Sequence, residues 1–83
     1  MFKNKAEDSN NICGKRIAEL RKAMKPKMSQ RALAEKMQIE GIDFEKNAIQ
    51  IIEAGKRFVT DIEIVAFAKV LKVTTDYLLG LSN

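Results

Sequence analysis

Apolar side chains recur at spacings of three and four between Asn11 and Gly80, and no stretch shows the alternation of a half-buried strand. Such spacings gather apolar residues on one face of an α-helix, so the sequence predicts an all-α protein. One Pro and four Gly among 83 residues leave few points at which helices would break. A chain of this length forms one domain around one core. We therefore expect a compact bundle of five helices.

Local start and stop signals set the bounds of the first two helices. The first is expected to begin near Asn11, a plausible N-cap, and to end before Pro26, because the residue before a proline is disfavoured in the α region. The second opens at Ser29, which can cap it. Met28 can pack on Leu33 as a hydrophobic staple, which strengthens this start signal.

The third predicted helix runs from Phe44 to Ala54, with Asp43 as its N-cap and Gly55 as its C-cap. Its inner face consists of Phe44, Ala48, Ile49 and Ile52. A short connector containing Gly41 joins it to the second helix, and the two together form a candidate helix-turn-helix.

The fourth helix has the strongest start signal in the chain. Thr60 and Glu63 have the spacing of a capping box, in which each side chain bonds the other residue's backbone N–H. A short fifth helix follows, capped by Thr74 or Thr75 and ended by Gly80. The sequence leaves open which threonine is the cap.

Residues 1–10 lack hydrophobic periodicity and are expected to form a flexible arm, which leaves residues 11–83 as the domain. The arm has no apolar core like that of a signal peptide. The longest uncharged apolar run, Ile64–Ala68, is far too short to span a membrane. We therefore expect a cytoplasmic protein that does not enter a membrane.

The residues that most enzymes use are scarce in this chain. Cys13 is the one cysteine and there is no histidine, so the sequence offers neither an internal disulfide, nor a zinc ligand set, nor the usual general base. Cys13 is expected to be a small buried residue of the first helix. The sequence predicts no enzyme, and no metal, cofactor or small-molecule ligand.

The net charge of +4 suits a polyanionic partner but is common among proteins that bind none. More informative is the outer face of the third helix, which carries Lys46, Asn47, Gln50 and Ile51. Asn and Gln bind adenine with two hydrogen bonds, Lys reaches guanine acceptors, and an apolar side chain meets the thymine methyl. The alternative is that these residues form an ordinary solvated helix face.

Three segments resemble one family. Met28–Lys36 (MSQRALAEK) resembles the "SQ-x-x-LA" helix of XRE, or lambda-repressor-like, regulators. Ile49–Arg57 is similar to the "I-x-x-I-E-x-G-K-R" segment of that family, and Leu71–Gly80 resembles its closing helix. The resemblance extends from Ile12 to Gly80. It implies a five-helix lambda-repressor-like DNA-binding domain in which the second and third helices form the helix-turn-helix.

The resemblance also implies roles for particular residues. The base-reading positions fall on Lys46, Asn47, Gln50 and Ile51. The phosphate-binding set is Gln30, Arg31, Lys56 and Arg57. Glu53 is expected to pair with Arg21, and we assign this pair to stability, because a buried unpaired charge costs several kcal/mol.

The chain departs from the family pattern in its connector. Residues 38–43 make the turn between the second and third helices longer than is usual in the family, and Lys25–Lys27 lengthens the preceding turn. The resemblance therefore leaves open the tilt of the third helix. It also leaves open whether Glu45 lies at the interface or beside it.

Together these features predict a transcriptional regulator, most simply a repressor, that binds a short palindromic operator in double-stranded DNA. A homodimer would place two recognition helices about 34–36 Å apart, one DNA turn. The apolar segment Thr74–Asn83 is the expected dimer surface, unless it only closes the core of the monomer. The alternative function is a protein-interaction module, such as an antitoxin or adaptor. An exposed apolar patch at Leu79 and Leu81 would favour it.

Overall fold

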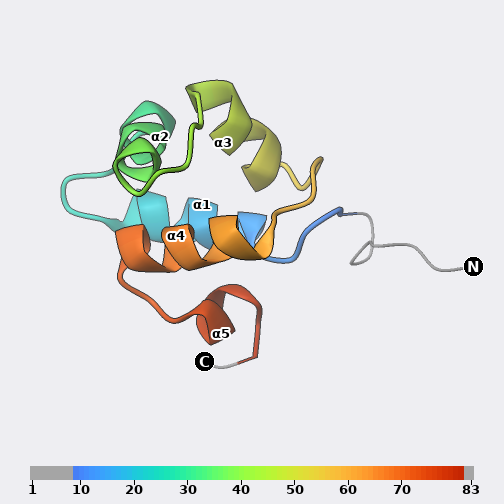
Figure 1. Ribbon diagram of the computed structural model, residues 1–83. Helices are drawn as coiled ribbons and strands as arrows, with labels where there is room; N and C mark the ends of the chain where they lie inside the picture. Colours follow the sequence, from blue (N-terminus) through green and yellow to red (C-terminus); the bar gives the residue numbers. More distant parts are fainter. Residues whose placement is uncertain (1–8, 82–83) are drawn as a thin grey trace, which may run out of the picture.

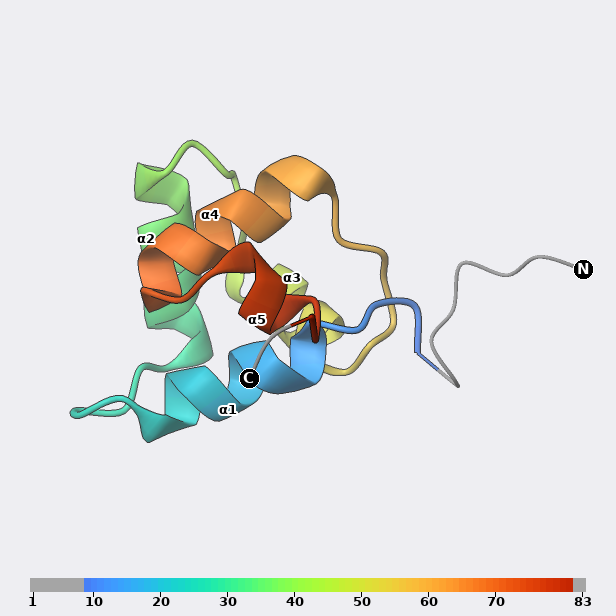
Figure 2. The same ribbon diagram turned by 90° about the horizontal axis from the view of Figure 1, so that it is seen from below.

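Five helices follow one another in the part of the chain that the structure, a computed structural model, describes, residues 9–81. They are α1 (Gly14–Ala23), α2 (Gln30–Ile39), α3 (Lys46–Glu53), α4 (Asp61–Leu71) and α5 (Thr75–Leu78). α1 and α4 lie in a middle layer, with α2 and α3 on one side and α5 on the other (Figures 1 and 2). The prediction of an all-α fold with five helices is confirmed for these residues.

One apolar core joins all five helices. Its fully buried side chains include Ile17, Leu33, Met37, Ile49, Ile52, Phe67 and Leu78. The ring of Phe44 lies 5.9 Å from that of Phe67, so the connector before α3 also reaches the core. Because α3 is packed on α1 and α2 through its buried residues, its opposite face is left toward solvent.

The caps predicted for the second, fourth and fifth helices are formed. The Ser29 hydroxyl accepts a hydrogen bond from the Ala32 N–H. Thr60 and Glu63 make the reciprocal bonds of a capping box. At α5 the cap is Thr74, whose hydroxyl accepts from the Tyr77 N–H, which settles the choice between the two threonines.

The predicted start of the third helix is wrong by two residues. α3 begins at Lys46 with Glu45 as N-cap, rather than at Phe44 with Asp43 as N-cap. The Gln38 side-chain amide donates to the Phe44 carbonyl at 2.7 Å and so occupies the acceptor that the first helical turn would have used. The Ala48 N–H bonds Glu45 O instead, at 3.0 Å. Phe44 is buried as expected, but it projects from the connector.

The connector between α2 and α3 is held at both ends. At its start the Ile42 N–H donates to Met37 O at 2.9 Å, and at its end Phe44 is buried. Between them, Gly41 has a φ of +89° and no neighbouring atom within 4 Å of the position a Cβ would take. The connector is therefore an open tip between two fixed ends.

The first helix also begins later than expected. α1 starts at Gly14, and no side chain at its N-cap position, Cys13, makes a cap bond. Asn11 still satisfies the helix start, because its Oδ1 accepts from the Gly14 N–H at 2.7 Å. As predicted, the helix ends before Pro26.

Two residues on the arm side of the predicted domain boundary are bonded to the domain. Ser9 and Asn10, assigned to the arm, are hydrogen-bonded to Gly55 and Lys56. Residues 1–8 of the arm and residues 82–83 at the end of the predicted domain lie outside the described residues.

No helix in residues 9–81 is long and apolar enough to cross a membrane. Nor do three or more His, Cys, Asp or Glu side chains in these residues gather as they would around a metal ion.

Candidate nucleic-acid interface

The four residues predicted to read bases lie together on the outer face of α3. Lys46, Asn47, Gln50 and Ile51 are all exposed. Since successive residues of an α-helix are turned by about 100°, the four occupy an arc of roughly 140°. Ile49 and Ile52, on the other side of the helix, are fully buried. The core therefore fixes which face of α3 is exposed to solvent.

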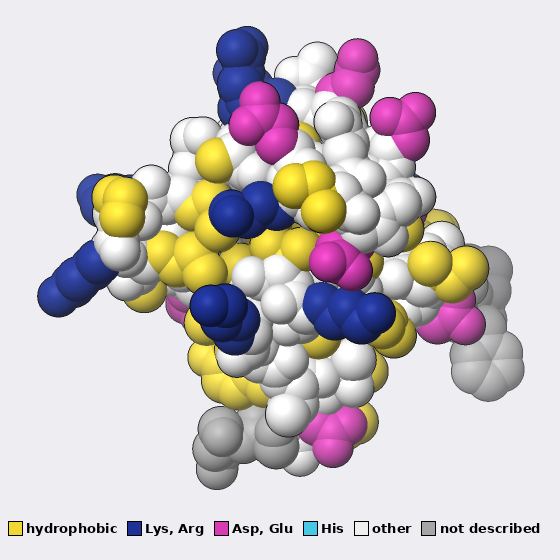
Figure 3. Space-filling model, turned by 60° about the vertical axis from the view of Figure 1, so that its left-hand side comes forward, with side chains coloured by type: hydrophobic (Ala, Val, Ile, Leu, Met, Phe, Trp, Pro, Cys, Tyr) yellow, Lys and Arg dark blue, Asp and Glu magenta, His cyan; other side chains and the backbone are white. Residues whose placement is uncertain are grey.

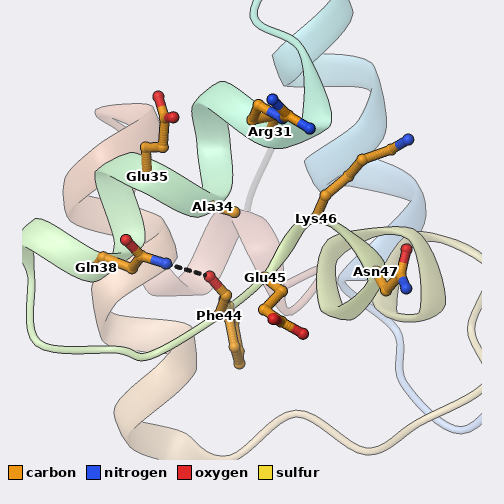
Figure 4. A pocket seen from close by; sticks show the side chains of 8 residues that line it. All are labelled: Arg31, Ala34, Glu35, Gln38, Phe44, Glu45, Lys46 and Asn47. Atoms are coloured by element: carbon orange, nitrogen blue, oxygen red, sulfur yellow. Dashed lines mark hydrogen bonds between the residues drawn. The ribbon is translucent and has the colours of Figure 1, made fainter.

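An open hollow of about 450 Å³ lies between this face and α2 (Figure 4). It is lined by Arg31, Ala34, Glu35, Gln38, Phe44, Glu45, Lys46 and Asn47. The side chains of Arg31 and Lys46 extend toward the same end of it, and both also line a neighbouring hollow beside Ser29 and Gln30. Two cations from different helices thus flank one end of the outer face of α3.

The surface is not uniformly basic. Figure 3 shows Lys and Arg side chains interspersed with acidic side chains and apolar surface. In the hollow itself, Glu35 and Glu45 lie with Arg31 and Lys46. Glu45 makes no cap bond to α3, so its carboxylate is not taken up by the helix start. This arrangement disfavours indiscriminate attraction of phosphates along the whole face.

The expected ion pair between Arg21 and Glu53 is formed. Arg21 Nε lies 2.7 Å from Glu53 Oε2 and Nη2 lies 2.9 Å from Oε1, a two-pronged contact between α1 and α3. The remaining guanidinium nitrogen, Nη1, donates to Met28 O at 3.0 Å. The hydrogen bonds to Glu53 raise the pKa of Arg21 above its ordinary value. With side chains only 11% and 8% exposed, the pair fixes α3 against α1.

The predicted phosphate-binding residues divide into two kinds. Arg31 and Lys56 are exposed. Gln30 Nε2 instead donates to Glu53 Oε1 at 3.0 Å, which joins it to the Arg21 pair. Arg57 lies 3.1 Å from Glu63, with its guanidinium 5.3 Å from the centre of the Phe44 ring. In this structure Gln30 joins α2 to α3, and Arg57 joins the turn after α3 to α4, whereas the side chains of Arg31 and Lys56 are exposed.

The C-terminal segment contributes to the core. Leu78 is fully buried, and Tyr77 is half-buried, with the Arg16 guanidinium 4.8 Å from its ring centre. Leu79 packs partly against the core. Leu81 is 72% exposed. Closing the monomer is thus one role of this segment, and Leu81 is left available for another.

The sequence patterns missed the hydrogen bonds that Ser9, Asn10 and Asn11 make to the C-terminal end of α3. Asn11 Nδ2 donates to Ile52 O at 3.1 Å and to Arg57 O at 2.8 Å, and Asn10 Nδ2 donates to Lys56 O at 3.0 Å. Three polar residues before a helix carry no periodicity. No pattern in the sequence pointed to these contacts.

Comparison with known proteins found no matching family model, no similar curated protein and no similar solved structure. The function therefore has to be inferred from the residues and geometry described above.

Proposed function

We propose that this chain binds double-stranded DNA in a sequence-specific manner and acts as a transcriptional regulator, most simply a repressor. The observation that carries the proposal is the exposed face of α3, where Asn47 and Gln50 lie opposite the buried Ile49 and Ile52. Side-chain amides on a convex, exposed helix suit the major groove, whose width admits an α-helix and whose base edges pair with Asn and Gln. The resemblance to XRE regulators assigns the same residues to base reading.

Phosphate contacts would supply most of the affinity. Arg31 at the start of α2 and Lys56 after the end of α3 are exposed cations on the two sides of the recognition face. The dipole at the start of α2 favours an anion there as well. Each neutralised phosphate adds to the salt dependence of binding, whereas the base contacts of α3 add sequence preference.

A single domain of this size makes few base contacts, so we extend the proposal to a homodimer on a palindromic site. The C-terminal segment is the proposed contact, because Leu81 is 72% exposed beside the core residues of α5. Two-fold symmetry would place the two α3 helices about one DNA turn apart, 34–36 Å.

A second candidate function, binding of a protein partner, is favoured by the apolar surface of α4. Ile62 is 69% exposed and Val65 is 48% exposed, one helical turn apart. With Ile42 and Ala66 they line an open hollow. Exposed apolar side chains of this size are a common feature of protein-binding surfaces when they form one patch.

Selection from a pool of randomised duplex DNA at near-physiological salt tests the proposed function. Enrichment of a palindrome with half-sites one turn apart would support a dimeric operator-binding regulator. Enrichment of a single half-site would support DNA recognition but reject the dimer. Retention without enrichment, or no retention, would reject sequence-specific binding and favour the protein-partner module.

A further inference from the structure

Residues Ser9, Asn10 and Asn11, here called the N-terminal clasp, bind the turn that follows α3. The carbonyls that receive their hydrogen bonds belong to Ile52, Gly55, Lys56 and Arg57. The last carbonyls of a helix have no partner within it, so donors from elsewhere are needed to fix this end. The clasp supplies these donors from more than forty residues earlier in the chain, with sequence separations of 41 and 46.

Asn11 forms the fixed centre of the clasp. Its Nδ2 bonds two carbonyls, those of Ile52 and Arg57, while its Oδ1 accepts from the Gly14 N–H at 2.7 Å. The start of α1 and the end of α3 are therefore joined through one side chain. Gly14 permits this approach, since a Cβ there would overlap the Ile52 carbonyl oxygen.

Asn10 acts on the backbone around Lys56. Its own N–H donates to Gly55 O at 2.7 Å, and its Nδ2 donates to Lys56 O at 3.0 Å. These two carbonyls belong to the peptide groups on either side of the Lys56 Cα. The Lys56 N–H in turn donates to Ile51 O at 3.0 Å. The backbone of Lys56 is thus held on every side while its side chain stays exposed.

We propose that Asn10 is a positioning residue for the contact between Lys56 and a DNA phosphate. The inference rests on the proposed function and extends it to a residue that would act through Lys56 rather than through a DNA contact of its own. A cation whose backbone is already fixed loses less conformational entropy when it binds, so preorganisation raises affinity without a new contact. The hydrogen bond from Asn10 to Lys56 O is exposed, and water can replace it, so stability alone does not account for it well.

A double-mutant cycle tests this role. Affinity for the selected DNA would be measured between 0.05 and 0.2 M salt for the unmodified chain, Asn10→Ala, Lys56→Ala and the double variant. Loss of one phosphate contact reduces the salt-driven fall in affinity over this range by about 3.5-fold. We expect Lys56→Ala to reduce the slope of log affinity against log salt concentration by this amount. Asn10→Ala should reduce the same slope by at least about half as much. In the Lys56→Ala background, Asn10→Ala should add nothing.

The matched control is the same cycle with Lys46→Ala. Lys46 is at the other end of α3 and far in sequence from the clasp, so Asn10→Ala should add its full effect there. Thermal melts would set a temperature at which every variant is folded. A purely structural role of Asn10 would lower Tm but, at a temperature where every variant is folded, would leave the salt slope unchanged.

The outcomes separate this inference from the function on which it rests. If the unmodified chain binds its DNA but Asn10→Ala leaves the salt slope unchanged, or is additive with Lys56→Ala, the positioning role is rejected and DNA binding stands. If the unmodified chain binds no DNA, the proposed function is rejected and the inference falls with it.

Discussion

Replacing Arg21 by Met is expected to cost the protein much of its stability. The change removes both hydrogen bonds to Glu53 and the bond to Met28 O, and it leaves a carboxylate that is 8% exposed with Gln30 as its remaining donor. Breaking a fully buried pair costs about 3–5 kcal/mol. Because this pair is part-buried and Glu53 keeps the bond from Gln30, we expect a loss near the lower end, about 3 kcal/mol. A domain of 83 residues has about 4–12 kcal/mol in total.

Thermal and urea unfolding followed by circular dichroism would measure this loss. At about 4–8 °C per kcal/mol for a domain of this size, we expect Tm to fall by about 12–24 °C. The matched control is Lys22→Met, an exposed neighbour on α1, which should change the free energy of unfolding by less than about 0.5 kcal/mol.

A second variant tests the physical reason for the loss. Arg21→Met combined with Glu53→Met removes both charges, and replacement of a buried ion pair by apolar residues is often neutral or stabilising. The double variant should therefore recover most of the stability that Arg21→Met loses. A Tm of Arg21→Met within a few degrees of the unmodified chain would refute the reasoning, and so would a double variant no more stable than the single one.

Three further changes have expected outcomes. Gly14→Ala should lower the free energy of unfolding by about 3 kcal/mol or more, because the added Cβ would overlap the Ile52 carbonyl. A urea midpoint close to that of the unmodified chain would contradict the close packing of the Gly14 backbone on Ile52. Burial raises the pKa of Cys13 from 9.0 to about 11, so the thiol should resist thiol reagents at pH 8 in the folded chain. Because the thiol ionises at a lower pH in the unfolded chain, the contribution of Cys13 to the free energy of unfolding is complete below pH 9 and falls by about 1.4 kcal/mol per pH unit up to about pH 11. Urea titrations at each pH would measure this fall, and Cys13→Ala should lack it. Asn47→Ala with Gln50→Ala should reduce discrimination by about 1–3 kcal/mol per base contact without changing Tm, and an unaltered base preference in the DNA selection would reject the recognition face.

Local signals in the sequence were sufficient for most of the fold. The caps at Ser29 and Thr60 depend on residues within one turn of each other, so the pattern alone specifies them. The start of α3 depends instead on Gln38, which takes the Phe44 carbonyl from across the connector. Phe44 fitted the helical spacing because it is buried, and burial alone does not distinguish a helical residue from one in a connector.

The candidate site was predictable where one helix carries it. Asn47 and Gln50 share a face because they are three residues apart on α3. Arg57 was predicted to bind phosphate, and the structure adds a partner that was not expected, Glu63, which also completes the capping box. The capping box accounted for Glu63 in the sequence, so nothing there indicated a second partner.

The two fixed ends of the connector before α3 have a consequence for evolution. Gln38 and Phe44 hold the base of the turn, and Gly41 stands at an open tip that no side chain crowds. Residues can then be inserted or deleted at the tip without a change in the direction of the helix axis that follows. We therefore expect the length of this turn to vary between related sequences, and Phe44 and the ring on which it packs, Phe67, to be retained together.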